Sequence, residues 1–130
     1  MKAEKVVDTN VLISKRFLSL KEFMLTESVL QEFAEFTYEK YVENMNASKE
    51  ERALGYLKFF RYTMELISKH VLLVHSYRDY LEAMDLSRER SIDITDALIT
   101  VAALRSHAVV ITRDRDFERV RDLIGVEILK

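Results

Sequence analysis

Short apolar runs alternate along the chain with longer segments in which apolar residues recur at helical spacing. The apolar runs, each a candidate buried strand, cover residues 5–7, 22–26, 71–74, 109–111 and 126–129. The longest helical patterns cover residues 29–42, 54–67 and 94–105, where apolar positions lie three or four residues apart. Strands that are apolar throughout and alternate with helices indicate a parallel sheet covered on both faces. We therefore predict an α/β protein: a three-layer α/β/α fold around a central, mainly parallel twisted sheet.

Serine residues mark where several helices are expected to begin. Ser28 and Ser48 each open a sequence with the spacing of a capping box, in which a serine hydroxyl and a Glu or Gln side chain satisfy helix-end amides. Ser76 is predicted to cap the following helix, and Ser91 or Asp93 the helix after that. A short helix or turn is expected after residue 10 and another after residue 114.

Composition narrows the class of protein. Residues 1–130 are enough for one domain, and 48% hydrophobic with 32% charged residues is typical of a globular chain. The absence of cysteine excludes disulfides, thiolate metal sites and a cysteine nucleophile, and it favours a reducing cytoplasm. No apolar run approaches the roughly 18 residues of a membrane span, and the first ten residues lack a signal-peptide pattern. Two glycines and no proline predict long helices with tight connections.

Charge is informative through its distribution. The formal net charge is −2, so the whole chain is not a basic nucleic-acid clamp. Half of the aspartates lie between residues 93 and 116. A local basic cluster stands beside them, formed by Arg113, Arg115, Arg119 and Arg121. These arginines either form a solvated helix face paired with nearby acids or contact phosphates of a nucleic acid.

Four carboxylates are expected to meet at one end of the sheet. Asp8 directly follows the first apolar run, and Asp114 follows the fourth after two residues. In an open parallel sheet, the carboxyl ends of the strands form the ligand-binding edge. Asp96 lies in the first turn of an apolar helix, and Glu32 one turn into another. Asp93 is the weaker candidate of its pair because it has a competing role as an N-cap.

An oxygen-only set of ligands predicts a particular metal chemistry. Without nearby histidine or cysteine, the four carboxylates suit Mg²⁺ or Mn²⁺ and not Zn²⁺. Carboxylates about 5 Å apart repel by roughly 3 kcal/mol per pair, so converging acids need a cation or bound protons. A divalent ion there can orient a phosphodiester and generate hydroxide from bound water.

Four segments, in this order and spacing, resemble the PIN domain family. They are residues 6–13 (VVDTNVLI), 28–33 (SVLQEF), 96–99 (DALI) and 110–117 (VITRDRDF). The first and last segments together are fairly specific, and the resemblance covers essentially the whole chain. It implies a parallel sheet between helices and an Mg²⁺- or Mn²⁺-dependent ribonuclease site. A stand-alone domain of this size most resembles the toxin subunit of VapC-type toxin–antitoxin pairs.

The resemblance also implies residue roles and partners. The implied catalytic acids are Asp8, Glu32, Asp96 and Asp114, of which Asp8, Asp96 and Asp114 bind the metal. The implied supporting residues are Asp116, Thr112 and Asn10. Asp116 either touches the metal or caps the last short helix. Arg113 and Arg115 are candidate contacts to an RNA substrate. The expected protein partners are an antitoxin and a second copy in a homodimer, on helices 29–42 and 54–67.

Several alternatives stay open beside the toxin. A ribonuclease of RNA processing or quality control and a non-catalytic PIN-like binding module fit the same pattern. A receiver-like module needs adjacent acids at the end of its first strand, where this chain offers only Asp8. An aspartate-nucleophile phosphatase needs a second acid two residues on, where this chain has Asn10. The aromatic and charged stretch 38–68 matches no family motif, and its rings either stack on bases or pack against protein.

Overall fold

Five parallel strands form one sheet in the computed structural model, which describes residues 4–130. The strands lie in the order β3-β2-β1-β4-β5, and every neighbouring pair is parallel. Their bounds are β1 (Glu4–Val7), β2 (Met24–Thr26), β3 (Val71–Leu73), β4 (Ala108–Thr112) and β5 (Gly125–Ile128). The predicted parallel sheet is confirmed. The part of the N-terminal prediction that covers residues 1–3 lies outside the described residues.

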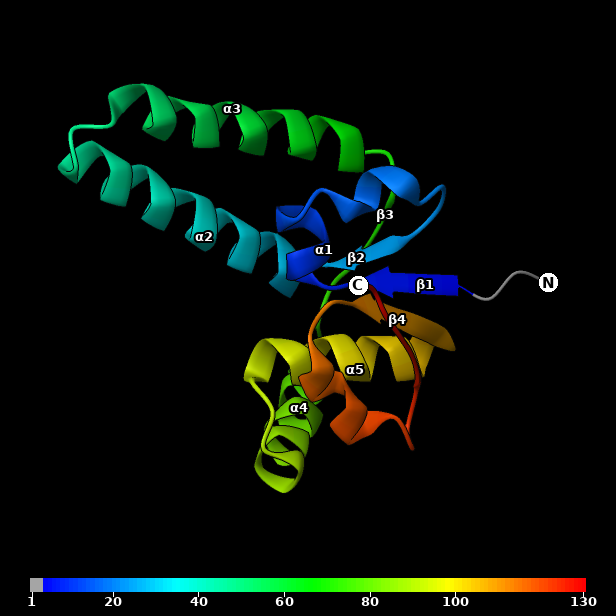
Figure 1. Cartoon of the computed structure of the whole chain (residues 1–130). Helices are drawn as coiled ribbons and strands as arrows, with labels where there is room; N and C mark the ends of the chain where they lie inside the picture. Colours follow the sequence, from blue (N-terminus) through cyan, green and yellow to red (C-terminus); the bar gives the residue numbers. More distant parts are fainter. Residues whose placement is uncertain (1–3) are drawn as a thin grey trace.

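Helices cover both faces of this sheet. Their bounds are α1 (Thr9–Ile13), η1 (Arg16–Ser19), α2 (Glu27–Asn46), α3 (Glu50–Ile67), α4 (Tyr77–Arg90), α5 (Ile94–Ser106) and η2 (Arg115–Val120). Figure 1 shows α4 and α5 on one side, α1, η1 and α3 on the other, and the α2–α3 hairpin projecting beyond the sheet. The three-layer α/β/α prediction is therefore confirmed. None of the helices within residues 4–130 has the length and apolar character needed to cross a membrane.

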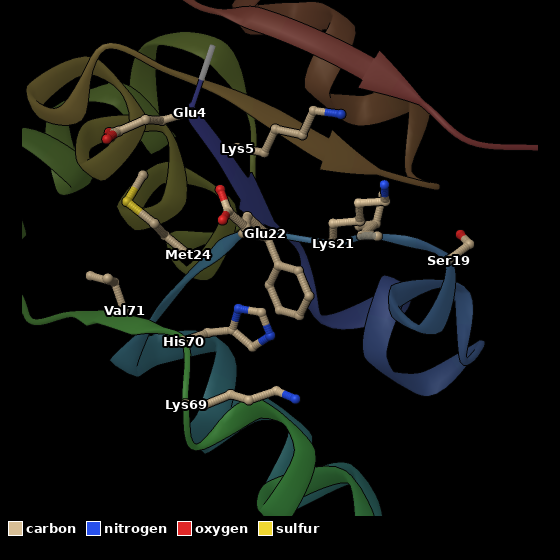
Figure 2. Close-up of a pocket in the computed structure, with 11 residues that line it drawn as sticks. Glu4, Lys5, Ser19, Lys21, Glu22, Met24, Lys69, His70 and Val71 are labelled. Atoms are coloured by element: carbon tan, nitrogen blue, oxygen red, sulfur yellow. The ribbon is translucent and has the colours of Figure 1, made fainter. Parts of the chain in front are cut away.

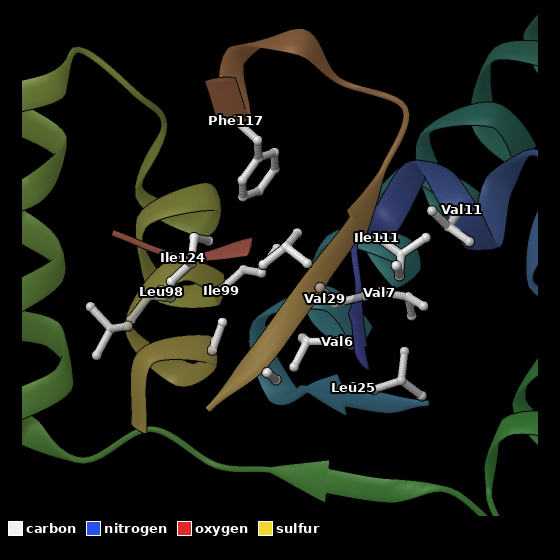
Figure 3. Packing of buried hydrophobic residues seen from close by; sticks show 14 of the residues in the cluster. Val6, Val7, Val11, Leu25, Val29, Leu98, Ile99, Ile111, Phe117 and Ile124 are labelled. Carbon is white, nitrogen blue, oxygen red and sulfur yellow. The ribbon is translucent and has the colours of Figure 1, made fainter. Parts of the chain in front are cut away.

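The core lies on both faces of the two central strands. Val6 and Val7 of β1 and Ile111 of β4 are fully buried, and Figure 3 shows helix side chains converging on them. Helix α5 is apolar on nearly every side because it lies between the sheet and α4. The strands that lead to Asp8 and Asp114 are thus fully buried at their carboxyl ends.

Aromatic side chains in the stretch 38–68 mainly hold α2 and α3 together. The Phe33 ring contacts the rings of Phe59 and Phe60, with centroids 5.9 and 5.2 Å apart. These rings are therefore packed against protein, as one of the two alternatives predicted. Tyr38 and Tyr62 remain mostly exposed on the outer surfaces of the hairpin.

Both predicted capping boxes are wrong. Helix α2 is capped by Thr26, whose Oγ1 accepts a hydrogen bond from the Val29 amide, because β2 runs directly into the helix. Ser28 therefore lies in the first turn. Ser48 has a positive φ of 59°, whereas a capping residue needs extended backbone. Helix α3 instead begins after Lys49, which makes no side-chain cap.

The cap at Ser76 is confirmed, and α4 begins with a complete capping box. The Ser76 hydroxyl accepts from the Asp79 amide at 3.2 Å, and the Asp79 carboxylate accepts from the Ser76 amide at 2.8 Å. Ser76→Ala is expected to lower the free energy of unfolding by about 1 kcal/mol in urea denaturation. Ser48→Ala is the matched control, with an expected change below about 0.5 kcal/mol. Equal losses in the two variants would contradict the cap.

Candidate active site

Asp8 stands at the junction between β1 and α1, where it is held from three directions. Its backbone amide donates to the Ile111 carbonyl at 2.9 Å, which ties the end of β1 to β4. Its Oδ1 accepts from the Thr9 amide and its Oδ2 from the Thr112 hydroxyl, both at 2.7 Å. The side chain is only 3% exposed. The Asp8 carboxylate is therefore fixed at the carboxyl edge of the sheet.

Thr112 connects the two strand ends that carry Asp8 and Asp114. Its hydroxyl donates to Asp8 and accepts from the Asp114 amide at 2.9 Å. Asn10 Nδ2 lies 3.5 Å from the same Thr112 oxygen, and Asn10 Oδ1 accepts from the Arg113 amide at 3.0 Å. The side chains of Thr112 and Asn10 thus belong to one hydrogen-bond network, which fixes the backbone around Asp8 and Asp114.

Asp114 and Asp116 occupy different environments. Asp114 is half-buried and caps η2, since its Oδ1 accepts from the Asp116 amide at 2.9 Å. Asp116 is exposed, and its carboxylate lies 3.8 Å from Arg119. The helix cap that was predicted as one role of Asp116 is therefore provided by the side chain of Asp114. Asp116 contributes its backbone amide, which donates to the Asp114 carboxylate.

Asp96 enters the site from the first turn of α5. It is 7% exposed, and its carboxylate receives no hydrogen bond or ion pair from the rest of residues 4–130. Its pKa is raised to about 8, mainly by burial and in addition by the negative charges of Asp8 and Asp114. A buried carboxylate without a donor is costly unless it binds a proton or a cation.

Asp93, the weaker candidate of the pair in the sequence analysis, adds a negative charge beside Asp96. It occupies the predicted N-cap position of α5, but its side chain makes no capping hydrogen bond. Its charge contributes to the raised pKa of Asp96. The spacing of three residues between Asp93 and Asp96 already indicated that their carboxylates could lie close together. The Asp93 side chain was instead expected to form a helix cap.

Glu32 completes the group from the second turn of α2. It is half-buried, and its charge helps to raise the pKa of both Asp8 and Asp96. The pKa of Asp8 rises to about 6, mainly because of burial and against the lowering effect of its hydrogen bonds from Thr112 and Thr9. The four predicted acids therefore share one electrostatic environment.

Among the described residues 4–130, no basic side chain forms an ion pair with Asp8, Glu32, Asp96 or Asp114. Each charge therefore repels the others through a partly buried region of low dielectric constant. Such an arrangement is typical of a binding site and not of a structural ion-pair network.

A family model for the PIN domain matches residues 5–123 of the chain. The chain belongs to the PIN domain family. No curated protein matches its sequence.

Solved structures share the fold of this PIN domain. A VapBC-5 toxin–antitoxin protein from Mycobacterium tuberculosis superposes with a TM-score of 0.64 at 20% identity, covering 99% of both chains. A toxin–antitoxin complex from Klebsiella pneumoniae gives a TM-score of 0.60 at 19% identity, over 95% of this chain and 96% of the other. FitAcB from Neisseria gonorrhoeae gives 0.60 at 18% identity, over 94% and 95%. At sequence identities of 18–20%, these similarities show a shared fold.

The acids of this PIN domain fit a divalent cation in charge and in donor chemistry. Only oxygen donors are present, and the Asp96 carboxylate lacks any protein partner among residues 4–130. Within the same residues, no three His, Cys, Asp or Glu side chains stand in a ready-made metal-binding arrangement. An ion held by three of these carboxylates would therefore require side chains other than the fixed Asp8 to move closer to it.

The arginines beside the site divide into two groups. Three of them pair with acids of the same short helix at 3.5 to 4.0 Å: Arg115, Arg119 and Arg121. Arg113 is exposed and forms no ion pair with the part of the chain that the structure describes. These three arginines therefore fit the first of the two predicted alternatives, a solvated helix face paired with nearby acids. Arg113 has the free guanidinium that a phosphate contact requires.

Proposed function

We propose that this PIN domain is a divalent-metal-dependent RNA endonuclease. The observation that carries the proposal is the gathering of unneutralised acids at the carboxyl edge of β1 and β4, with the pKa of Asp8 raised to about 6 and that of Asp96 to about 8. These two groups and Asp114 would hold Mg²⁺ or Mn²⁺, with Glu32 as the fourth catalytic acid. When bound by these residues, such an ion would supply the chemistry of an activated water and a polarised phosphodiester.

The chain's own residues position the reacting groups. The Thr112 hydroxyl and the Thr9 amide hold the Asp8 carboxylate in one orientation, so it needs little reorganisation when it binds the ion. Asn10 fixes the backbone of Arg113, whose exposed guanidinium contacts a phosphate of the RNA. Arg113 thereby offsets the repulsion between the RNA and the acids.

We further propose that the protein is the toxin of a toxin–antitoxin pair and acts in the cytoplasm. Two of the solved structures with this fold, from Mycobacterium tuberculosis and Klebsiella pneumoniae, are toxin–antitoxin proteins by name. The antitoxin would cover the acids and contact the α2–α3 hairpin, where Tyr38 and Tyr62 are 66% and 55% exposed.

A homodimer is also proposed, and α4 gives it a further candidate surface. Exposed apolar residues recur there at helical spacing: Tyr77, Tyr80, Leu81 and Met84. A stripe of this kind is typical of a protein–protein contact.

The nuclease proposal is tested by incubating the purified protein with single-stranded RNAs, with Mn²⁺ or with EDTA. We expect cleavage within the RNA chain in Mn²⁺ and none in EDTA. Cleavage that is equally fast in EDTA, or a lack of cleavage of every RNA in Mn²⁺ and Mg²⁺, would refute it.

Addition of Mn²⁺ is expected to raise the melting temperature because the ion relieves the repulsion among the acids. A concentration of 100 times the dissociation constant stabilises the fold by about 2.7 kcal/mol. For a chain of this size, that corresponds to a shift of roughly 10 °C in differential scanning fluorimetry.

Two aspartate variants serve as controls for this shift. Asp96→Asn should lose most of it, whereas Asp85→Asn should retain it because Asp85 is exposed and pairs with Arg88 on α4. A shift that survives Asp96→Asn unchanged would place the ion elsewhere.

A further inference from the structure

A hollow of about 890 Å³ lies at the amino ends of β1, β2 and β3, at the end of the sheet opposite the acids. It exists because β2 begins late. Glu4 of β1 already pairs with β4, whereas the pairing of β1 with β2 is at Val6 and Met24. The chain segment before β2, residues 19–23, is therefore not paired with β1, and it forms one wall of the hollow. The hollow falls within the roughly 300–1,000 Å³ of small-molecule sites.

Three lysines surround the hollow. Lys5 lies on β1, Lys21 precedes β2 and Lys69 precedes β3, and Figure 2 shows them around the opening. None of them forms an ion pair with another residue in the range 4–130, although Glu4 and Glu22 line the same hollow. Three lysines and two glutamates give the lining a formal charge of +1, in a chain of net charge −2. The hollow is therefore suited to an anion.

The floor of the hollow is aromatic. The rings of Phe23 and His70 are stacked, with centroids 4.0 Å apart and planes at 17°. Phe23 is 6% exposed and so holds His70, which is half-buried, in position. The nitrogens of the His70 imidazole form no hydrogen bond within residues 4–130, and Figure 2 shows this ring among the residues that line the hollow. The floor therefore offers a planar surface together with unused polar atoms.

We propose that this amino-edge hollow binds a nucleoside phosphate. The lysines supply the positive charge for the phosphate, and the base stacks on the face of the His70 ring that Phe23 does not cover. The ligand is either a free nucleotide or the phosphorylated end of an RNA strand, which share this chemistry. The inference does not depend on the acids at the opposite edge of the sheet.

The test is calorimetric titration of the full chain with AMP in EDTA, so that no divalent ion contributes. The Lys21→Gln, Lys69→Gln double variant is expected to weaken AMP binding about tenfold or more, because two charged hydrogen bonds are lost. Lys58→Gln on the exposed face of α3 is the matched control and should bind AMP as the unsubstituted protein does. Asp8→Asn should also bind AMP unchanged, which separates this site from the nuclease proposal.

Further probes identify the source of the ligand. Adenosine and inorganic phosphate should each bind at least about tenfold more weakly than AMP, because each reaches only one part of the hollow. A short 5′-phosphorylated RNA that displaces AMP would identify an RNA end as the source, and failure to displace it would identify a free nucleotide. An absence of heat at about 1 mM AMP, or equal weakening by Lys58→Gln, would overturn the proposal.

Discussion

Asp8→Asn is expected to reduce Mn²⁺-dependent RNA cleavage by about a thousandfold or more, and to leave the fold intact. The side chain is at the centre of the site, where it accepts from both the Thr9 amide and the Thr112 hydroxyl. Asparagine keeps the shape of the side chain but removes the charge that binds a cation. The loss therefore concerns catalysis more than packing.

The measurement compares initial cleavage rates of the variant and the unsubstituted protein on the same RNA, together with their circular dichroism spectra. Without metal, Asp8→Asn should melt close to the temperature of the unsubstituted protein, because the removal of one repelling charge offsets the loss of one of the two hydrogen-bond acceptors. Asp85→Asn, on the exposed surface of α4, should cleave at the unsubstituted rate. An Asp8→Asn protein that is folded and fully active would refute the proposed role of Asp8.

The metal-free protein is expected to lose stability as the pH rises from about 4 to about 8. Burial and neighbouring carboxylates raise the pKa of Asp8 to about 6 and that of Asp96 to about 8, from 3.8 for both. The folded state therefore holds more protons than the unfolded state in this interval, so the free energy of unfolding falls with rising pH. At about 1.4 kcal/mol per pKa unit, the expected loss is several kcal/mol, and it levels off above pH 8.

Urea denaturation in EDTA at a series of pH values measures this loss. Asp96→Asn should remove the larger part of it and, at pH 8, should be more stable than the unsubstituted protein. Mn²⁺ should restore stability to the unsubstituted protein at pH 8, because it favours the ionised carboxylates. Stability that rises with pH in the unsubstituted protein would contradict the raised pKa values.

The sequence predicted best those features that depend on the local pattern of apolar and polar residues. An apolar run that stops at Asp8 defines both the strand and the edge at which its carboxylate lies. The same reasoning holds for β4 and Asp114, so the order of the sheet brings the two acids to one edge. Asp96 and Glu32 were predicted to lie near the beginnings of two helices, and the structure places them in the first turn of α5 and the second turn of α2.

The features that sequence did not predict depend on tertiary placement. The caps at Ser28 and Ser48 failed because the end of β2 and a positive backbone φ decide where the helices begin. Asp93 was expected to cap α5 with its side chain, and only the structure shows that its charge is left beside Asp96. The amino-edge hollow depends on the late start of β2 relative to β1, which no single segment reveals.

The central claim, that folding gathers separate acids into one cation-binding site, is tested most directly by anomalous diffraction from crystals soaked in Mn²⁺. We predict a dominant peak at the carboxyl edge of β1 and β4, with oxygens of Asp8, Asp96 and Asp114 at about 2.1 Å from the ion. A strong peak elsewhere, with these carboxylates uncoordinated at a saturating Mn²⁺ concentration, would contradict the claim.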